Sequence, residues 1–216
     1  MRNLFLDLKI KRELKKFVAF KNSYNFKMKE IEKRDDGAVF CDGACLRENA
    51  DAEWVGETES LVNVGYIIHG ANHSKVLSNL FPYKFYFKGH KMACAESVFQ
   101  AFKFKDKKLQ KFVFEYSALN ANRVKGCSDY DWKESGKVYF LGKEYDRHSK
   151  EYELLLDEMY ISMLQNPLFV QALKNVGDKY IMHAMGEEDR EKTTFSREEF
   201  EKELNILKAY VVSKHR

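Results

Sequence analysis

The sequence contains no long uninterrupted apolar run, and its start carries no charged stretch followed by an apolar core. A helix that crosses a membrane needs about 20 mainly apolar residues, and a secretory signal needs a basic start ahead of an apolar segment. Because both patterns are missing, we expect a cytoplasmic protein with no membrane partner.

Glycine-rich phosphate loops are also missing. The 216 residues include 11 glycines, and these form neither a Walker A motif nor a dinucleotide-binding fingerprint. The sequence therefore excludes the kinases and dehydrogenases that depend on those loops. It also shows no internal repeat and no low-complexity segment.

Metal-binding patterns are weak. The 4 cysteines form no Cys-x-x-Cys pair, and the spacing of Cys41 and Cys45 is a poor zinc pattern because no histidine pair lies nearby. The histidines are scattered without ligand spacing, at His69, His73, His90, His148, His183 and His215. We expect reduced thiols, no metal site and no cofactor.

The sequence does contain enough apolar material for a core. Hydrophobic residues make up 44% of the chain, which suffices for one sizeable core with an appended segment. The net charge of +4 arises from 37 basic and 33 acidic residues. This mild excess is compatible with a phosphate-bearing ligand, but it is far below the charge density of a dedicated DNA-binding domain.

The segment of residues 1–36 is basic and has helical periodicity. Apolar residues recur at helical spacing among its lysines, at Ile10, Leu14, Phe17 and Val18. The pattern predicts a basic amphipathic helix, ended by a turn at residues 35–37. Two interpretations remain open: a helix packed on the main domain, or a surface for nucleic acid or another partner.

Two short strands are predicted next, at residues 38–41 and 61–68, and the second is apolar enough for a central strand. The polar segment of residues 47–54 lies between them and contains Trp54. This composition is typical of a surface loop that covers a site. Trp54 either stacks on a base or closes the core.

The middle of the chain alternates and then becomes helical. Phe85 and Phe87 alternate with polar or amphipathic residues before Gly89 and His90, which predicts a hairpin with its turn at those two residues. The helical periodicity over residues 93–104 predicts a helix directly after the hairpin.

One face of this predicted helix carries Glu96, Gln100 and Lys103, while the opposite face carries Val98, Ala101 and Phe102. A charged stripe on a helix is most often a solvated surface. The alternative is a reactive site, favoured by the neighbouring Phe99, because aromatic groups around a carboxylate raise its pKa toward use as an acid or base.

Helices are predicted for most of the remaining chain, so the fold class is α+β, mainly α, with a small β-sheet or hairpin and a surrounding helical bundle. The predicted helices are residues 107–116, residues 118–125, a core stripe from Tyr152 to Met163, a helix from Asn166 to Gly177, and a last helix behind the capping box Ser196-x-x-Glu199. Arg123 in the second of these either binds phosphate or is solvated.

The motif residues resemble those of a known family. The run Leu77-Ser78-Asn79-Leu80-Phe81-Pro82, then Gly89, and then the stretch from Ala95 to Lys103 are similar to the motif of the NADAR (YbiA-like) superfamily. The resemblance covers residues 62–210. It implies a single NADAR-like catalytic domain over residues 37–216, preceded by the segment of residues 1–36.

This resemblance implies an N-glycosidase that hydrolyses a ribose C1–nitrogen bond in a phosphorylated ribosyl or ADP-ribosyl substrate. Such substrates are a riboflavin-pathway phosphoribosylamino-pyrimidine or ADP-ribosylated guanine, free or attached to nucleic acid. The bond breaks through an oxocarbenium-like state that a carboxylate stabilises. The implied catalytic residues are Glu96 and Lys103, and the implied substrate-binding residues are Ser78, Asn79, Phe99, Gln100, Arg123 and His148.

The segment of residues 185–196 departs from the family, because a Trp-Gly-Gly-rich loop is replaced there by a charged sequence. The departure leaves the substrate open. Two other classes of protein also stay open: a noncatalytic ADP-ribose or nucleotide-binding module, and a nucleic-acid-binding protein that uses the basic start of the chain.

Overall fold

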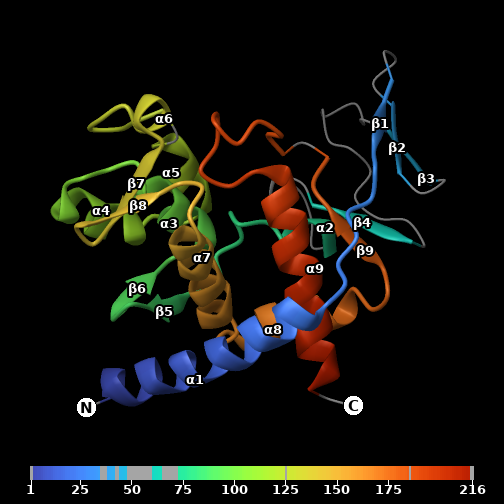
Figure 1. The fold of residues 1–216 in the computed structure, drawn as a ribbon, viewed down its shortest axis with the longest axis horizontal. Coiled ribbons are helices and arrows are strands. Elements are labelled where there is room, and N and C mark those ends of the chain that lie inside the picture. Colours follow the sequence, from blue (N-terminus) through green and yellow to red (C-terminus); the bar gives the residue numbers. More distant parts are fainter. Residues whose placement is uncertain are drawn as a thin grey trace.

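The computed structural model describes residues 2–34, 38–41, 44–47, 60–64, 73–124, 126–184 and 186–214. Within these ranges the chain is mainly helical, with short strands in small separate sheets (Figure 1), which confirms the predicted α+β, mainly α class. The predicted turn at residues 35–37, the loop around Trp54 and the end of the predicted strand beyond Val64 lie outside the described residues.

The first helix, α1 (Arg2–Ser23), packs against α7 (Lys150–Met163) and α9 (Arg197–Ser213) along one edge of the molecule (Figure 1). Ile10 and Phe17 are buried in the core from this helix. α1 is thus packed on the main body, as the first interpretation of this segment expected. Among the described residues, no helix combines the length and apolarity that crossing a bilayer requires.

The strands form one three-stranded sheet and several pairs. β1 (Glu32–Lys33), β2 (Ala38–Cys41) and β3 (Ala44–Arg47) are antiparallel. β4 (Leu61–Asn63) and β9 (Tyr180–Met182) pair in parallel, with Leu61 opposite Tyr180. The parallel pair brings together segments of the chain that are more than a hundred residues apart, and it forms one side of the site described below.

Two antiparallel hairpins complete the strands. β5 (Phe85–Phe87) pairs with β6 (His90–Met92), and β7 (Lys137–Phe140) pairs with β8 (Lys143–Asp146). The first hairpin turns at Lys88 and Gly89, whose φ angles are 50° and 77°. The turn therefore begins one residue before the predicted position, because both central residues of such a tight turn take positive φ.

The shorter helices match most of the sequence pattern. They are α2 (His73–Val76), α3 (Ala95–Ala101), α4 (Lys107–Phe114), α5 (Ala118–Arg123), α6 (Trp132–Ser135) and α8 (Pro167–Asn175). The Asn166 side chain caps α8 by accepting from the Leu168 amide. The predicted capping box of Ser196 and Glu199 opens α9. Both caps satisfy backbone donors that a helix start leaves free.

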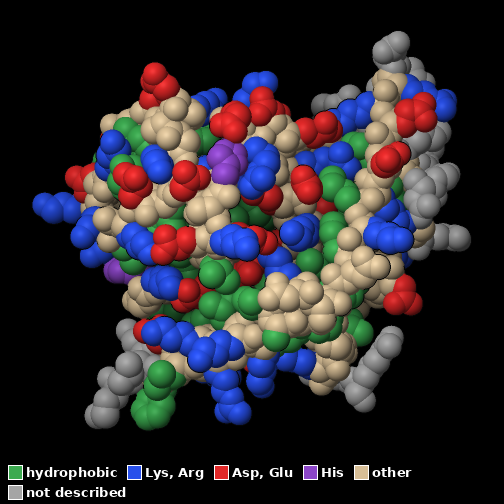
Figure 2. Space-filling view, viewed as in Figure 1, with side chains coloured by type: hydrophobic (Ala, Val, Ile, Leu, Met, Phe, Trp, Pro, Cys, Tyr) green, Lys and Arg blue, Asp and Glu red, His purple; other side chains and the backbone are tan. Residues whose placement is uncertain are grey.

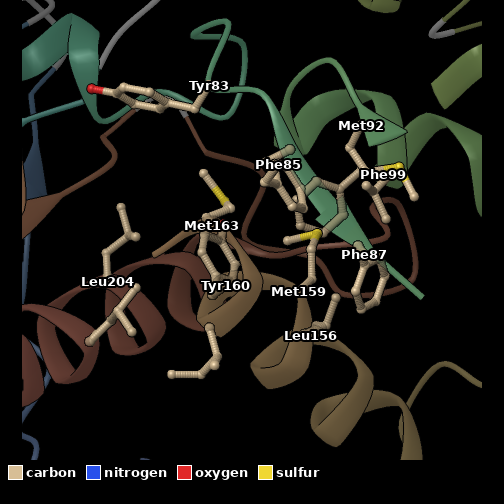
Figure 3. Close-up of a cluster of buried hydrophobic side chains, with 14 of the residues drawn as sticks. Tyr83, Phe85, Phe87, Met92, Phe99, Leu156, Met159, Tyr160, Met163 and Leu204 are labelled. Carbon is tan, nitrogen blue, oxygen red and sulfur yellow. The ribbon is translucent and has the colours of Figure 1, made fainter. Parts of the chain in front are cut away.

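The core is organised around α7. Figure 3 shows Leu156, Met159, Tyr160 and Met163 of this helix directed toward Phe85, Phe87 and Met92 of the first hairpin and toward Phe99 of α3. Met159 and Tyr160 are fully buried. Burying a side chain of this size contributes about 1.5–3 kcal/mol. The predicted apolar stripe from Tyr152 to Met163 therefore belongs to the hydrophobic core. Its packing also positions α3, which forms part of the site described below.

Candidate functional site

A cavity of about 610 Å³ opens beside α3. This volume falls in the range of pockets that hold small molecules and nucleotides. The cavity is bounded by the turn at residues 78–80, by α3, by Trp132 at the start of α6, by the end of β9 and by the loop of residues 186–195. Its lining includes Ser78, Asn79, Glu96, Phe99, Gln100, Lys103, Trp132, His183, Thr193, Thr194 and Phe195.

The turn before the first hairpin is tied to the start of α3. The Glu96 backbone N–H donates to the Asn79 carbonyl at 2.9 Å. The Asn79 side-chain oxygen accepts from the Tyr160 hydroxyl at 2.7 Å, and Tyr160 is anchored in the core. The buried hydroxyl and the helix start together place Asn79 and Glu96 side by side on the cavity wall.

Glu96, Gln100 and Lys103, here called the polar triad, form a hydrogen-bonded series. The Gln100 amide Nε2 donates to Glu96 Oε1 at 2.5 Å, and Lys103 Nζ donates to Gln100 Oε1 at 2.8 Å. The orientation of the Gln100 amide is therefore determined by its neighbours, since the reverse orientation would place oxygen against a carboxylate and NH₂ against an ammonium group. The triad holds one anionic and one cationic group in fixed positions.

The solvated-face interpretation of this helix is wrong for two of the triad residues. Gln100 is 3% exposed and Lys103 is 7% exposed, while Glu96 is half-buried at the cavity. On the opposite face, Val98, Ala101 and Phe102 are completely buried. Both faces of α3 are thus enclosed, and the polar one is enclosed around a cavity.

Aromatic rings form much of the remaining wall. The Phe99 and Phe195 rings are stacked, with centroids 4.8 Å apart and an interplanar angle of 20°. Lys103 Nζ lies 5.6 Å from the centroid of the Trp132 ring, within the range of a cation–π interaction. A planar, partly charged ligand would therefore meet aromatic faces in a cavity whose lining is otherwise mainly polar and charged.

The loop of residues 186–195 is held by its backbone carbonyls. Arg147 Nε donates to the Thr193 carbonyl at 3.0 Å, and the buried Tyr152 hydroxyl donates to the Thr194 carbonyl at 2.6 Å. Arg147 also makes a two-pronged contact with Glu199, at 2.8 Å and 2.5 Å. Burial raises the pKa of Glu199, but the Arg147 guanidinium outweighs it and the net shift is downward. These contacts place Phe195 against Phe99.

His183 reaches the cavity from the end of β9. Its backbone N–H donates to Glu201 Oε1 at 2.9 Å, and its ring Nδ1 lies 2.7 Å from the Val64 carbonyl oxygen. Burial lowers the pKa of the ring. A neutral imidazole is therefore part of the cavity wall.

The predicted site residues do not all meet. The structure places Ser78, Asn79, Glu96, Phe99, Gln100 and Lys103 in the lining of one cavity. Arg123 and His148 do not line it. Arg123 is exposed at the end of α5 and donates to Asn120 at 3.3 Å, and His148 is exposed and lies 3.0 Å from Glu191.

Sequence reasoning missed Trp132, His183 and Phe195. These residues come from α6, the end of β9 and the loop before α9, and no spacing rule connects them to residues 96–103. The departure of residues 185–196 from the expected motif pointed to that loop without indicating which side chain enters the cavity. His183 had no local pattern at all.

Comparison with protein families matches most of the chain to a family model. A family model described as bacteriophage protein GP30.3 matches residues 72–209, which is more than half of the chain. No curated protein and no solved structure matches. The chain therefore belongs to the bacteriophage GP30.3 family. The resemblance to the NADAR (YbiA-like) superfamily is wrong as a family assignment, and the N-glycosidase and ADP-ribose descriptions taken from that family lose its support.

Proposed function

We propose that this member of the bacteriophage GP30.3 family is a hydrolase that cleaves a ribose C1–nitrogen bond in a phosphorylated ribosyl substrate, with Glu96 as the catalytic carboxylate. The observation that carries the proposal is the polar triad on the wall of a nucleotide-sized cavity. The reaction class is the one expected from the sequence, and its support here is the geometry of the triad and the chemistry of its groups. Phosphorylated ribosyl compounds are abundant in the cytoplasm, the expected location.

The chemistry requires stabilisation of positive charge that develops at ribose C1. A carboxylate beside that carbon stabilises an oxocarbenium-like state or activates the attacking water. Glu96 Oε1 is held by Gln100, and among the described residues no donor reaches its other oxygen, Oε2. Oε2 is therefore the atom that we assign to the sugar or to the water.

Lys103 supplies a buried positive charge at the site, and Lys33 and Lys192 also line the cavity. The Lys103 ammonium group is held between Gln100 and the face of Trp132. In the proposed reaction the ammonium group binds the phosphate or a ribose hydroxyl. In the alternative, its proton passes to the leaving base, the neutral amine attacks C1 as the C1–nitrogen bond breaks, and water then hydrolyses the C1–Nζ bond. Ser78, Asn79 and Gln100 are the neutral groups that orient the ribose or the base, and Phe99 provides an apolar face.

The direct test is incubation of the full-length protein with a panel of ribose N-glycosides, followed by mass detection of the released base. The panel includes nucleoside monophosphates and phosphoribosylamines. Glu96→Gln keeps the size of the side chain and removes its charge, so we expect at least a hundredfold loss of base release with unchanged thermal unfolding. Glu115→Gln, at an exposed position beyond α4, is the matched control. Equal turnover by the Glu96→Gln protein would rule out the proposed role.

A further variant, Lys103→Arg, separates the roles of Lys103. Lys103→Arg keeps the positive charge but replaces the primary amine, so it retains part of the activity if Lys103 acts through charge. Loss of all activity, together with a covalent adduct that borohydride traps on the unaltered protein, would assign it as a nucleophile. A ligand-induced rise in the unfolding temperature without any product would instead favour a noncatalytic nucleotide-binding module.

A further inference from the structure

The ring of His183 has a determined tautomer. Its Nδ1 lies 2.7 Å from the carbonyl oxygen of Val64, at hydrogen-bond distance. A carbonyl oxygen has lone pairs and no proton, so Nδ1 must carry the hydrogen of this bond. In a neutral ring the other nitrogen, Nε2, then has a lone pair and no proton. Among the described residues, no group makes a hydrogen bond to Nε2.

The ring is also held in place on its other sides. The Phe200 ring packs against it with centroids 4.9 Å apart. A Cβ added at Gly186 would lie 2.8 Å from His183 Cδ2 and 3.0 Å from the His183 carbonyl oxygen, closer than such contacts allow. The absence of a side chain at Gly186 therefore lets the chain pass directly over the imidazole. Glu201 is near enough to raise the pKa of the ring, yet burial, the largest effect, keeps it below the ordinary value.

We infer that His183 Nε2 is a specificity-determining hydrogen-bond acceptor, which selects a ligand that presents a neutral O–H or N–H group at this wall of the cavity. A fully ionised phosphate or carboxylate offers only lone pairs there, so such a group is disfavoured at this point relative to elsewhere in the cavity. The inference rests on the proposed function only for the ribosyl nature of the ligand. The donor is then either a ribose hydroxyl or an amino group of the base.

The experiment measures binding by calorimetry in the full-length Glu96→Gln protein, so that hydrolysis does not consume the ligand. The probes are guanosine monophosphate, deoxyguanosine monophosphate, which lacks the 2′-hydroxyl, and inosine monophosphate, which lacks the 2-amino group. One net hydrogen bond contributes about 0.5–1.5 kcal/mol, so we expect one of the two analogues to bind about 3- to 10-fold more weakly than the parent compound.

Two substitutions assign that difference to His183. In His183→Asn the amide reaches the position of Nδ1 but not that of Nε2, so the preference for the parent compound should disappear. In His183→Gln the amide reaches the position of Nε2 and offers an acceptor, so part of the preference should remain. The comparison in which His183→Asn abolishes the preference identifies the group that donates to Nε2. The donor is the ribose 2′-hydroxyl if the lost preference is over deoxyguanosine monophosphate, and the base amino group if it is over inosine monophosphate.

The inference is overturned if guanosine monophosphate binds no more tightly than either analogue, or if none of the three nucleotides binds at millimolar concentration. It is also overturned if His183→Asn keeps the preference for the parent compound unchanged. If His183→Asn does not fold, a full preference in a folded His183→Leu protein overturns it equally. Failure of the proposed hydrolysis is a separate result, since it shows as absent base release by the unaltered protein and leaves this binding pattern intact.

Discussion

The rings of Phe99 and Phe195 stack at a centroid distance of 4.8 Å, and this contact joins α3 to the loop that precedes α9. Phe195 lies in the cavity lining and is also part of a smaller cavity of about 210 Å³ on its other side. The Phe195 ring therefore separates the two cavities, and the position of the loop before α9 determines the shape of both.

Replacing Phe195 by Ala should enlarge the site and destabilise the fold. Loss of the ring removes the stack on Phe99 and a tilted contact with Tyr160, and for a half-buried ring we expect a cost of about 2 kcal/mol in the free energy of unfolding. Nucleotide affinity should fall in the same variant. Phe112→Ala is the control, because that ring is 60% exposed and its loss should cost at most about 0.5 kcal/mol. Equal effects of the two changes in urea unfolding would contradict this role of Phe195.

Gly186→Ala should be far more damaging than Gly126→Ala. The added Cβ would meet His183 Cδ2 at 2.8 Å and Arg197 Cβ at 2.9 Å, so the loop or the imidazole must move. We expect a loss of about 1–3 kcal/mol in stability and weaker ligand binding. At Gly126 an added Cβ meets nothing within 4 Å, so Gly126→Ala should change the unfolding free energy by less than about 1 kcal/mol. Thermal unfolding of both variants, with nucleotide titration, checks the contrast.

The cap of α9 should matter for the site as well as for the fold. Ser196 Oγ accepts from the Glu199 amide at 3.3 Å, directly after Phe195. Ser196→Ala should cost about 1 kcal/mol and lower ligand affinity, because the loop end loosens. Ser149 caps α7 in the same way and does not line the larger cavity. Ser149→Ala should cost a similar amount of stability but leave affinity unchanged, so a parallel loss of affinity in both variants would argue against a local effect.

Stability should fall as the pH rises through the neutral range. Lys21 of α1 lies 2.5 Å from Asp157 and 2.8 Å from Glu203. Burial, together with the negative charge of Asp157, raises the pKa of Glu203 from 4.5 to about 8, although Lys21 opposes the shift. Glu203 Oε1 is also buried without a hydrogen-bond partner among the described residues. One cation therefore faces two buried carboxyl groups, besides the exposed Glu153 at 3.3 Å, and we assign a retained proton to the buried pair.

The sign follows from the two pKa values of Glu203. Between pH 4.5 and about 8 the folded state keeps a proton that the unfolded state has lost, so the stabilising contribution is complete below pH 4.5 and is lost as the pH rises through 8. In Glu203→Gln this group no longer titrates, and the slope of stability against pH should flatten. Urea unfolding at pH 5, 7 and 9 measures it. Parallel profiles for the two proteins would show that Glu203 is ionised in the folded state.

Local sequence patterns determined most of the described helices, though not α2 or α6, together with the caps of α8 and α9 and the polar triad. The spacing of Glu96, Gln100 and Lys103 places them on one face of any helix, and the Asn166 and Ser196 caps require only neighbouring backbone amides. These features depend on interactions within a few residues, which is why the sequence alone could predict them. The turn of the first hairpin, by contrast, was misplaced by one residue. Its φ angles are set by pairing across the strands, which a local pattern does not contain.

Tertiary structure alone decided which side chains meet the triad. His183 reaches the cavity through the parallel pairing of β4 and β9, Phe195 through the loop held by Arg147 and Tyr152, and Trp132 from the start of α6. Such contacts join residues that are far apart in the chain, and sequence spacing carries no information about them. The sequence by itself therefore determined one reactive face, whereas packing around α7 determined that this face is enclosed and that a neutral imidazole shares its cavity.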